Sequence, residues 1–73
     1  MEPSMNTFFS DARRILNTIK AYLDMPNISN AQIEKLTIFA GMIGEMEDII
    51  KSEGESSLVR MHEHLLDIQK QIQ

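Results

Sequence analysis

The chain has 73 residues and no cysteine, so it forms one domain close to the lower size limit for a self-sufficient core, without a disulfide or thiolate metal site to reinforce it. A hydrophobic content of 42% and a charged content of 25% indicate a globular protein, and the net charge of −4 makes nucleic-acid binding unlikely. No apolar run approaches the ~20 residues of a membrane span and the N-terminal residues do not form a signal peptide, so we expect a cytoplasmic protein without membrane contact.

The first predicted helix covers about residues 4–24, with Ser4 as a candidate N-cap. Its apolar side chains recur every three or four residues, as in a helix that faces a core: Met5, Phe8, Ala12, Ile15, Ile19 and Tyr22. Asp11 falls on the side of the helix opposite these apolar residues. Pro26 ends the helix, and the short connection that follows predicts an antiparallel second helix.

The second predicted helix covers about residues 29–52 and has the clearest local signals of the chain. Ser29 and Gln32 form a capping box at its start, and Gly54 offers a terminator with positive φ at its end. Its apolar arc spans roughly 220°, whereas an ordinary surface helix needs somewhat over 100°. The helix should therefore be contacted from two directions, either by its own chain alone or by its own chain and a partner.

The third predicted helix covers about residues 57–72, after a turn at 55–57 that is followed by a new N-cap; alternatively, Ser52 and Glu55 form an earlier capping box. Its core line has coiled-coil spacing and consists of Leu58, Met61, Leu65, Ile68 and Ile72. A second apolar line runs through Val59 and Leu66. The pattern predicts an all-α fold, a small three-helix antiparallel bundle that is oligomeric, with a dimer favoured.

The candidate partner or oligomer interface combines the surplus apolar lines of helices two and three. It consists of Ile38, Met42, Ile49, Val59, His62 and Leu66. Because His62 lies on an apolar face, its imidazole needs a hydrogen-bond partner. It is then either a satisfied histidine or a group whose protonation loosens an interface below about pH 6.

Two further groups of residues admit a structural and a functional interpretation. Gly41 and Gly44 fall on the polar arc of helix two, where they are either a tolerated helix cost or the place at which another backbone approaches closely. Acidic side chains gather near the end of the same helix, as a solvated corner or as a contact patch for a basic partner: Glu45, Asp48, Glu53 and Glu55.

Catalytic, cofactor and metal sites are not expected. His62 and His64 are two residues apart, so their rings point roughly 160° apart and cannot share an ion. There is no cysteine nucleophile, no G-x-S-x-G elbow and no glycine-rich phosphate loop. The most direct hypothesis is a small non-enzymatic protein–protein interaction module, such as an inhibitor, adaptor or small chaperone. The alternatives are a DNA-associated transcriptional regulator and a structural self-assembly subunit.

Overall fold

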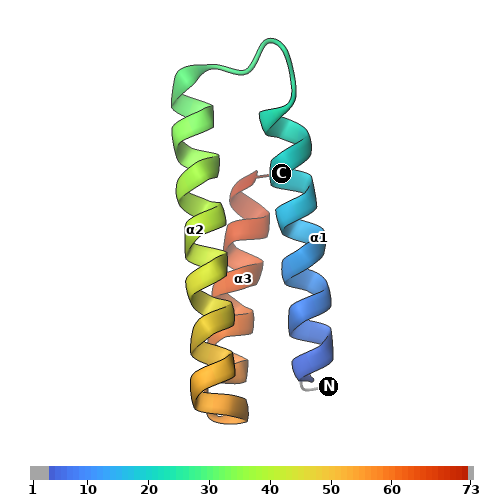
Figure 1. Ribbon diagram of the computed structural model, residues 1–73, viewed down its shortest axis with the longest axis vertical. Helices are drawn as coiled ribbons and strands as arrows, with labels where there is room; N and C mark the ends of the chain where they lie inside the picture. The colour runs from blue at the N-terminus through green and yellow to red at the C-terminus, as the bar shows by residue number, and fades with distance from the viewer. Residues whose placement is uncertain (1–3, 73) are drawn as a thin grey trace.

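The computed structural model describes residues 4–72, and every regular element in this range is helical. Helix α1 (Met5–Leu23) is followed by α2 (Asn30–Glu53), a 3-10 helix η1 (Gly54–Ser57) and α3 (Leu58–Ile72). The chain runs up α1, down α2 and up α3, so consecutive helices are antiparallel (Figure 1). The all-α prediction is confirmed, and each α-helix begins and ends within one residue of its expected bounds.

Side-chain caps fix the starts of α1 and α2, as the sequence predicts. The Thr7 backbone N–H donates to the Ser4 hydroxyl oxygen at 3.0 Å. At α2 the Gln32 N–H donates to Ser29 Oγ at 3.2 Å, and the Ser29 N–H donates to Gln32 Oε1 at 3.4 Å. Two backbone donors that the helix itself cannot satisfy are therefore paired at the start of α2.

The connection between α2 and α3 differs from the prediction. Gly54 has the expected positive φ, 71°. The expected turn at 55–57 is instead the 3-10 helix η1, which leads directly into α3. Ser57 is buried, and its hydroxyl donates to the Gly54 carbonyl at 3.3 Å instead of capping the first turn of α3. The N-cap prediction for this segment was wrong because the tight η1 turn satisfies the backbone groups locally.

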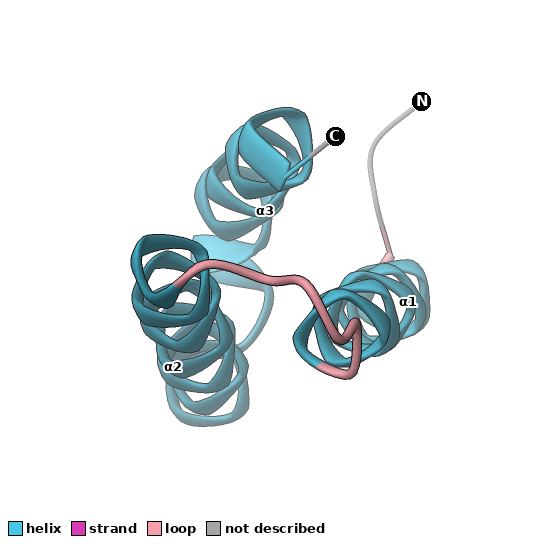
Figure 2. Cartoon of the chain, turned by 90° about the horizontal axis from the view of Figure 1, so that it is seen from above, coloured by secondary structure: helices cyan, strands magenta, loops and turns pink. Residues whose placement is uncertain are grey.

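The three α-helices surround one hydrophobic interior. Seen from above, α1, α2 and α3 lie at the corners of a triangle, and the loop after α1 bridges to α2 along one edge (Figure 2). Each helix contacts both others. The molecule is elongated along the helices, with extents of 40 × 21 × 15 Å.

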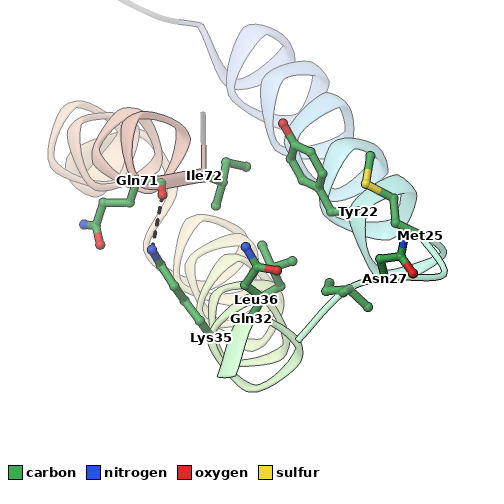
Figure 3. Close-up of a pocket in the computed structure, with 9 residues that line it drawn as sticks. Tyr22, Met25, Asn27, Gln32, Lys35, Leu36, Gln71 and Ile72 are labelled. Atoms are coloured by element: carbon green, nitrogen blue, oxygen red, sulfur yellow. Dashed lines mark hydrogen bonds between the residues drawn. The ribbon is translucent and has the colours of Figure 1, made fainter. Parts of the chain in front are cut away.

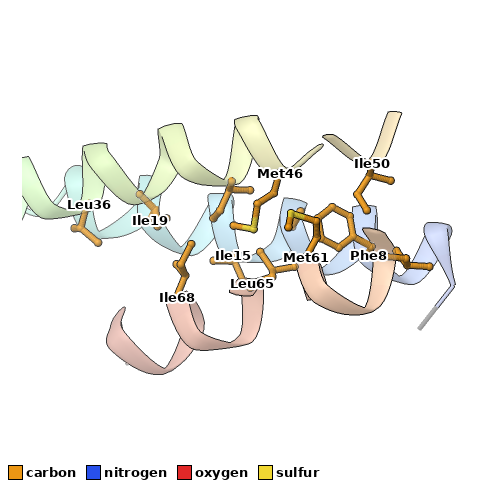
Figure 4. Packing of buried hydrophobic residues seen from close by; sticks show 12 residues of the cluster. Phe8, Ile15, Ile19, Leu36, Met46, Ile50, Met61, Leu65 and Ile68 are labelled. Atoms are coloured by element: carbon orange, nitrogen blue, oxygen red, sulfur yellow. The ribbon is translucent and has the colours of Figure 1, made fainter. Parts of the chain in front are cut away.

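The core is built from one stripe of each α-helix (Figure 4). Its members are Phe8, Ala12, Ile15, Ile19, Leu36, Ile43, Met46, Ile50, Leu58, Met61, Leu65 and Ile68. In α1 and α3 they come from the lines that the 3–4 spacing assigns to the interior. The core does not include Ile38, Met42, Val59 or Leu66, so it forms without these exposed apolar side chains of α2 and α3.

Candidate interaction surfaces

A row of apolar side chains on α2 is wholly or partly exposed in the described chain, and we call Ile38, Met42 and Ile49 the α2 stripe. Ile38 is 54% exposed and Met42 is 43% exposed, while Ile49 is partly buried and packs against the core. Their spacing of four and seven residues places them on one line of the helix. Three apolar side chains on one line, with Glu45 between Met42 and Ile49, differ from the scattered exposed apolar residues that any surface carries.

The α2 stripe follows the edge of α2 that adjoins α3. Lys35 precedes Met42 by seven residues, and its Nζ donates to the Gln71 backbone oxygen of α3 at 3.3 Å. Glu53 follows Ile49 by four residues, and its Oε1 lies 3.9 Å from Nη2 of Arg60 at the other end of α3. Polar contacts between α2 and α3 are therefore present at both ends of this edge, and the side chains of the α2 stripe lie between these contacts.

A second exposed apolar pair lies on α3, and we call Val59 and Leu66 the α3 pair. Val59 is 50% exposed and Leu66 is 37% exposed. His62 lies between them along the helix, and its Nε2 is 3.3 Å from Oδ2 of Asp11 in α1. The α3 pair therefore borders α1, on the side of α3 away from the α2 stripe.

The structure consequently divides five of the six predicted interface residues between two surfaces, and it places His62 beside the α3 pair in a contact with Asp11. The α2 stripe adjoins the flank of α3 that carries Arg60 and Gln71, and the α3 pair adjoins α1. The sequence could not reveal this division, because the position of each surplus line depends on which neighbour packs against which flank.

His62 has its hydrogen-bond partner inside the chain. Its side chain is largely buried and contacts Asp11, which also lies 3.4 Å from Nη2 of Arg14. The prediction that Asp11 lies on the side opposite the apolar residues was therefore wrong, since this carboxylate faces α3. A protonated imidazole would form a charge-assisted hydrogen bond with the same carboxylate. His62 therefore has the hydrogen-bond partner that its position on an apolar face requires, and the hypothesis that its protonation loosens an interface stays a prediction.

The two glycines of α2 are not approached closely by any part of the described chain. A Cβ atom built on Gly41 or Gly44 meets no atom within 4 Å beyond its own local helix. The acidic residues are exposed as well, and of the four only Glu53 forms a salt bridge among residues 4–72, with Arg60. Gly41 and the four acidic residues are exposed, while Gly44 is partly buried.

A cavity of about 390 Å³ is lined by the end of α1 and the loop after it, the first turns of α2 and the last turn of α3 (Figure 3). Tyr22, Leu36 and Ile72 line it together with polar side chains, among them Lys35, whose ammonium is already bonded to Gln71. Its volume is within the range of small-ligand sites. Sequence reasoning missed it because three separate segments form its wall. Ile72 in that wall is followed directly by Gln73, which lies outside the described residues, so we assign the cavity no function.

The described part of the chain offers no metal-binding group of three or more histidine or acidic side chains. Within the same residues, no helix combines the length and the apolar character that crossing a bilayer requires. The chain matches no protein-family model, no curated protein and no solved structure.

Proposed function

We propose that this chain is a small three-helix bundle that works as a non-enzymatic protein–protein interaction module, an inhibitor, adaptor or small chaperone that docks through the α2 stripe. The cytoplasmic location expected from its sequence is part of the same proposal. Its mode of action is the burial of an exposed helix face against another protein surface, as in other helix-mediated recognition.

The exposure of Ile38 and Met42 is the observation that supports this proposal. Both side chains stay in contact with water although the core has closed without them. Apolar surface removed from water stabilises a complex by roughly 25 cal/mol per Å². A line of such side chains on a regular helix offers this stabilisation to a partner without refolding of the chain.

The proposal is tested by placing a charge within the stripe. Ile38→Glu should abolish association, because a carboxylate would be buried in the contact without a partner. Thr37→Glu is the matched control, since Thr37 is exposed on the same helix but points about 100° away from Ile38. Sedimentation velocity of the purified protein and size fractionation of extracts from the source cells report self-association and association with other proteins. If Ile38→Glu changes neither profile, the α2 stripe is not a docking surface.

A structural self-assembly subunit is the second candidate, and the separation of the two exposed surfaces favours it. If the α2 stripe of one copy contacts the α3 pair of the next, the contact is heterologous and can continue into an open polymer. Light scattering should then show growth that continues with concentration. Val59→Glu should stop this growth, whereas a docking module that uses only α2 should be unaffected by it.

A further inference from the structure

We propose that the α2 stripe is occupied by a second copy of this chain, which binds through its own α2 in the antiparallel direction. The inference rests on the proposed function, because it names the partner of the same surface. It is carried by the order of charged and apolar residues along the exposed side of α2.

The exposed side of α2 carries a second seam with coiled-coil spacing. Its residues alternate by four and three positions, as the contact residues of paired helices do. They are Ala31, Lys35, Ile38, Met42, Glu45 and Ile49, and we call them the outer seam. All are exposed except Ile49, which is partly buried. The buried residues of α2 belong to a separate line.

The two charges of the outer seam determine the direction of pairing. In a parallel dimer Lys35 would face Lys35 and Glu45 would face Glu45, which places like charges opposite each other. In an antiparallel dimer with its twofold axis near Ala40, Lys35 faces Glu45 of the second copy. The same register places Ile38 against Met42 and Ala31 against Ile49. Every layer then pairs an apolar residue with an apolar residue, or a cation with an anion.

The two antiparallel registers shifted by one heptad are less favourable. One places Lys35 against Ile38 of the second copy, and the other places Ile38 against Ile49 but also Met42 against Glu45. A carboxylate would then be desolvated against an apolar side chain without a counter-charge. Charge pairing therefore selects the register with its axis near Ala40, while the apolar layers supply the affinity.

Both charged residues of the seam are free to take part in this pairing. Within residues 4–72 Glu45 forms no salt bridge. Lys35 donates to the Gln71 carbonyl and lies 5.7 Å from the centroid of the Phe39 ring. An ammonium group has three donors, so Lys35 can keep the Gln71 contact and still bind a carboxylate.

Reciprocal charge reversal tests the register. Lys35→Glu and Glu45→Lys should each weaken dimerisation at least tenfold, because each variant places like charges opposite each other twice. An equimolar mixture of the two variants should form a mixed dimer, since both contacts then join opposite charges. The double variant Lys35→Glu/Glu45→Lys should dimerise like the wild type. Sedimentation equilibrium gives the masses and dissociation constants, and circular dichroism verifies that each variant stays helical.

Control variants carry the same charge changes away from the seam. Lys70→Glu and Glu63→Lys alter exposed residues of α3 and should leave the dimer intact. If the mixture of the two seam variants stays monomeric while the wild type dimerises, the antiparallel register is wrong.

The failure of this inference can be distinguished from the failure of the proposed function. A wild-type chain that remains monomeric at its highest attainable concentration, yet forms an Ile38-dependent complex with a different protein, overturns only the second copy as the partner. If Ile38→Glu leaves every association of the chain unchanged, both proposals are overturned.

Discussion

The Nε2 atom of His62 in α3 lies 3.3 Å from Oδ2 of Asp11 in α1, and this hydrogen bond joins residues 51 positions apart. Since the carboxylate can only accept, the imidazole donates from Nε2. The contact sits at the edge of the core, where it fixes the flank of α3 that packs against α1. The hydrogen bond therefore helps to fix the rotation of α3 relative to α1, two helices that the chain connects only through α2 and η1.

We expect this hydrogen bond to contribute about 1 kcal/mol to the free energy of unfolding. Asp11→Ala and His62→Ala should each destabilise the protein, and the double variant should lose less than the sum of the two single losses, because the pair interacts directly. Urea unfolding followed by circular dichroism measures all four free energies.

Glu63→Ala is the control for this cycle, since Glu63 is exposed beside His62 and contacts neither residue of the pair. Its effect should be within about 0.5 kcal/mol. Strictly additive losses for Asp11→Ala and His62→Ala would show that the two side chains do not interact in solution.

The features that the sequence predicted correctly are those governed by local rules. Helical spacing identified the core lines, and residues within four positions of each other form the capping box of Ser29 and Gln32. The positive φ of Gly54 follows from the absence of a Cβ atom. None of these depends on how the helices are rotated against one another.

The features that the sequence missed depend on that rotation. Asp11 was assigned to the polar side of its own helix, and only the packing of α3 brings His62 to it. The six candidate interface residues were grouped together for the same reason. Helical periodicity shows that a helix carries more apolar side chains than one contact needs. It does not show which neighbouring helix will lie beside the additional ones.

The capping box of α2 gives a second prediction. Ser29→Ala should lower the free energy of unfolding by about 1 kcal/mol, because the Gln32 N–H loses its acceptor. For a domain of this size the loss corresponds to a fall of about 4–8 °C in Tm. Asn30→Ala, one residue later in α2, should cause no comparable fall. Equal Tm values for Ser29→Ala and Asn30→Ala would mean that the cap does not stabilise the helix.

Replacement by alanine should have opposite effects on the free energy of unfolding at Gly54 and at the two helical glycines, Gly41 and Gly44. Gly54 has φ 71° and ψ −149°, a conformation that alanine adopts only with strain, so Gly54→Ala should destabilise the protein by about 1–3 kcal/mol. Gly41 and Gly44 lie in α2 with open space around them, so alanine at either site should stabilise the protein by up to about 1 kcal/mol. Thermal unfolding of the three single variants measures this contrast. Destabilisation by Gly41→Ala would instead indicate a close backbone contact made by a partner.

Two isoleucines of α2 provide the last prediction, because they differ in burial but not in chemistry. Ile43 is fully buried and Ile38 is 54% exposed. Ile43→Ala should lower the free energy of unfolding by about 2–5 kcal/mol through lost burial and a residual cavity. Ile38→Ala should change it by no more than about 0.5 kcal/mol when the protein is dilute. Urea unfolding at low and high protein concentration measures both variants.

The concentration dependence of this comparison identifies the role of Ile38. Association stabilises the folded state by mass action, so the loss caused by Ile38→Ala should increase with protein concentration if a second copy covers the α2 stripe. The loss caused by Ile43→Ala in the monomer core should already be present when the protein is dilute. A large loss for Ile38→Ala in dilute solution would show that this side chain is buried within its own chain, and the surface would then be misassigned.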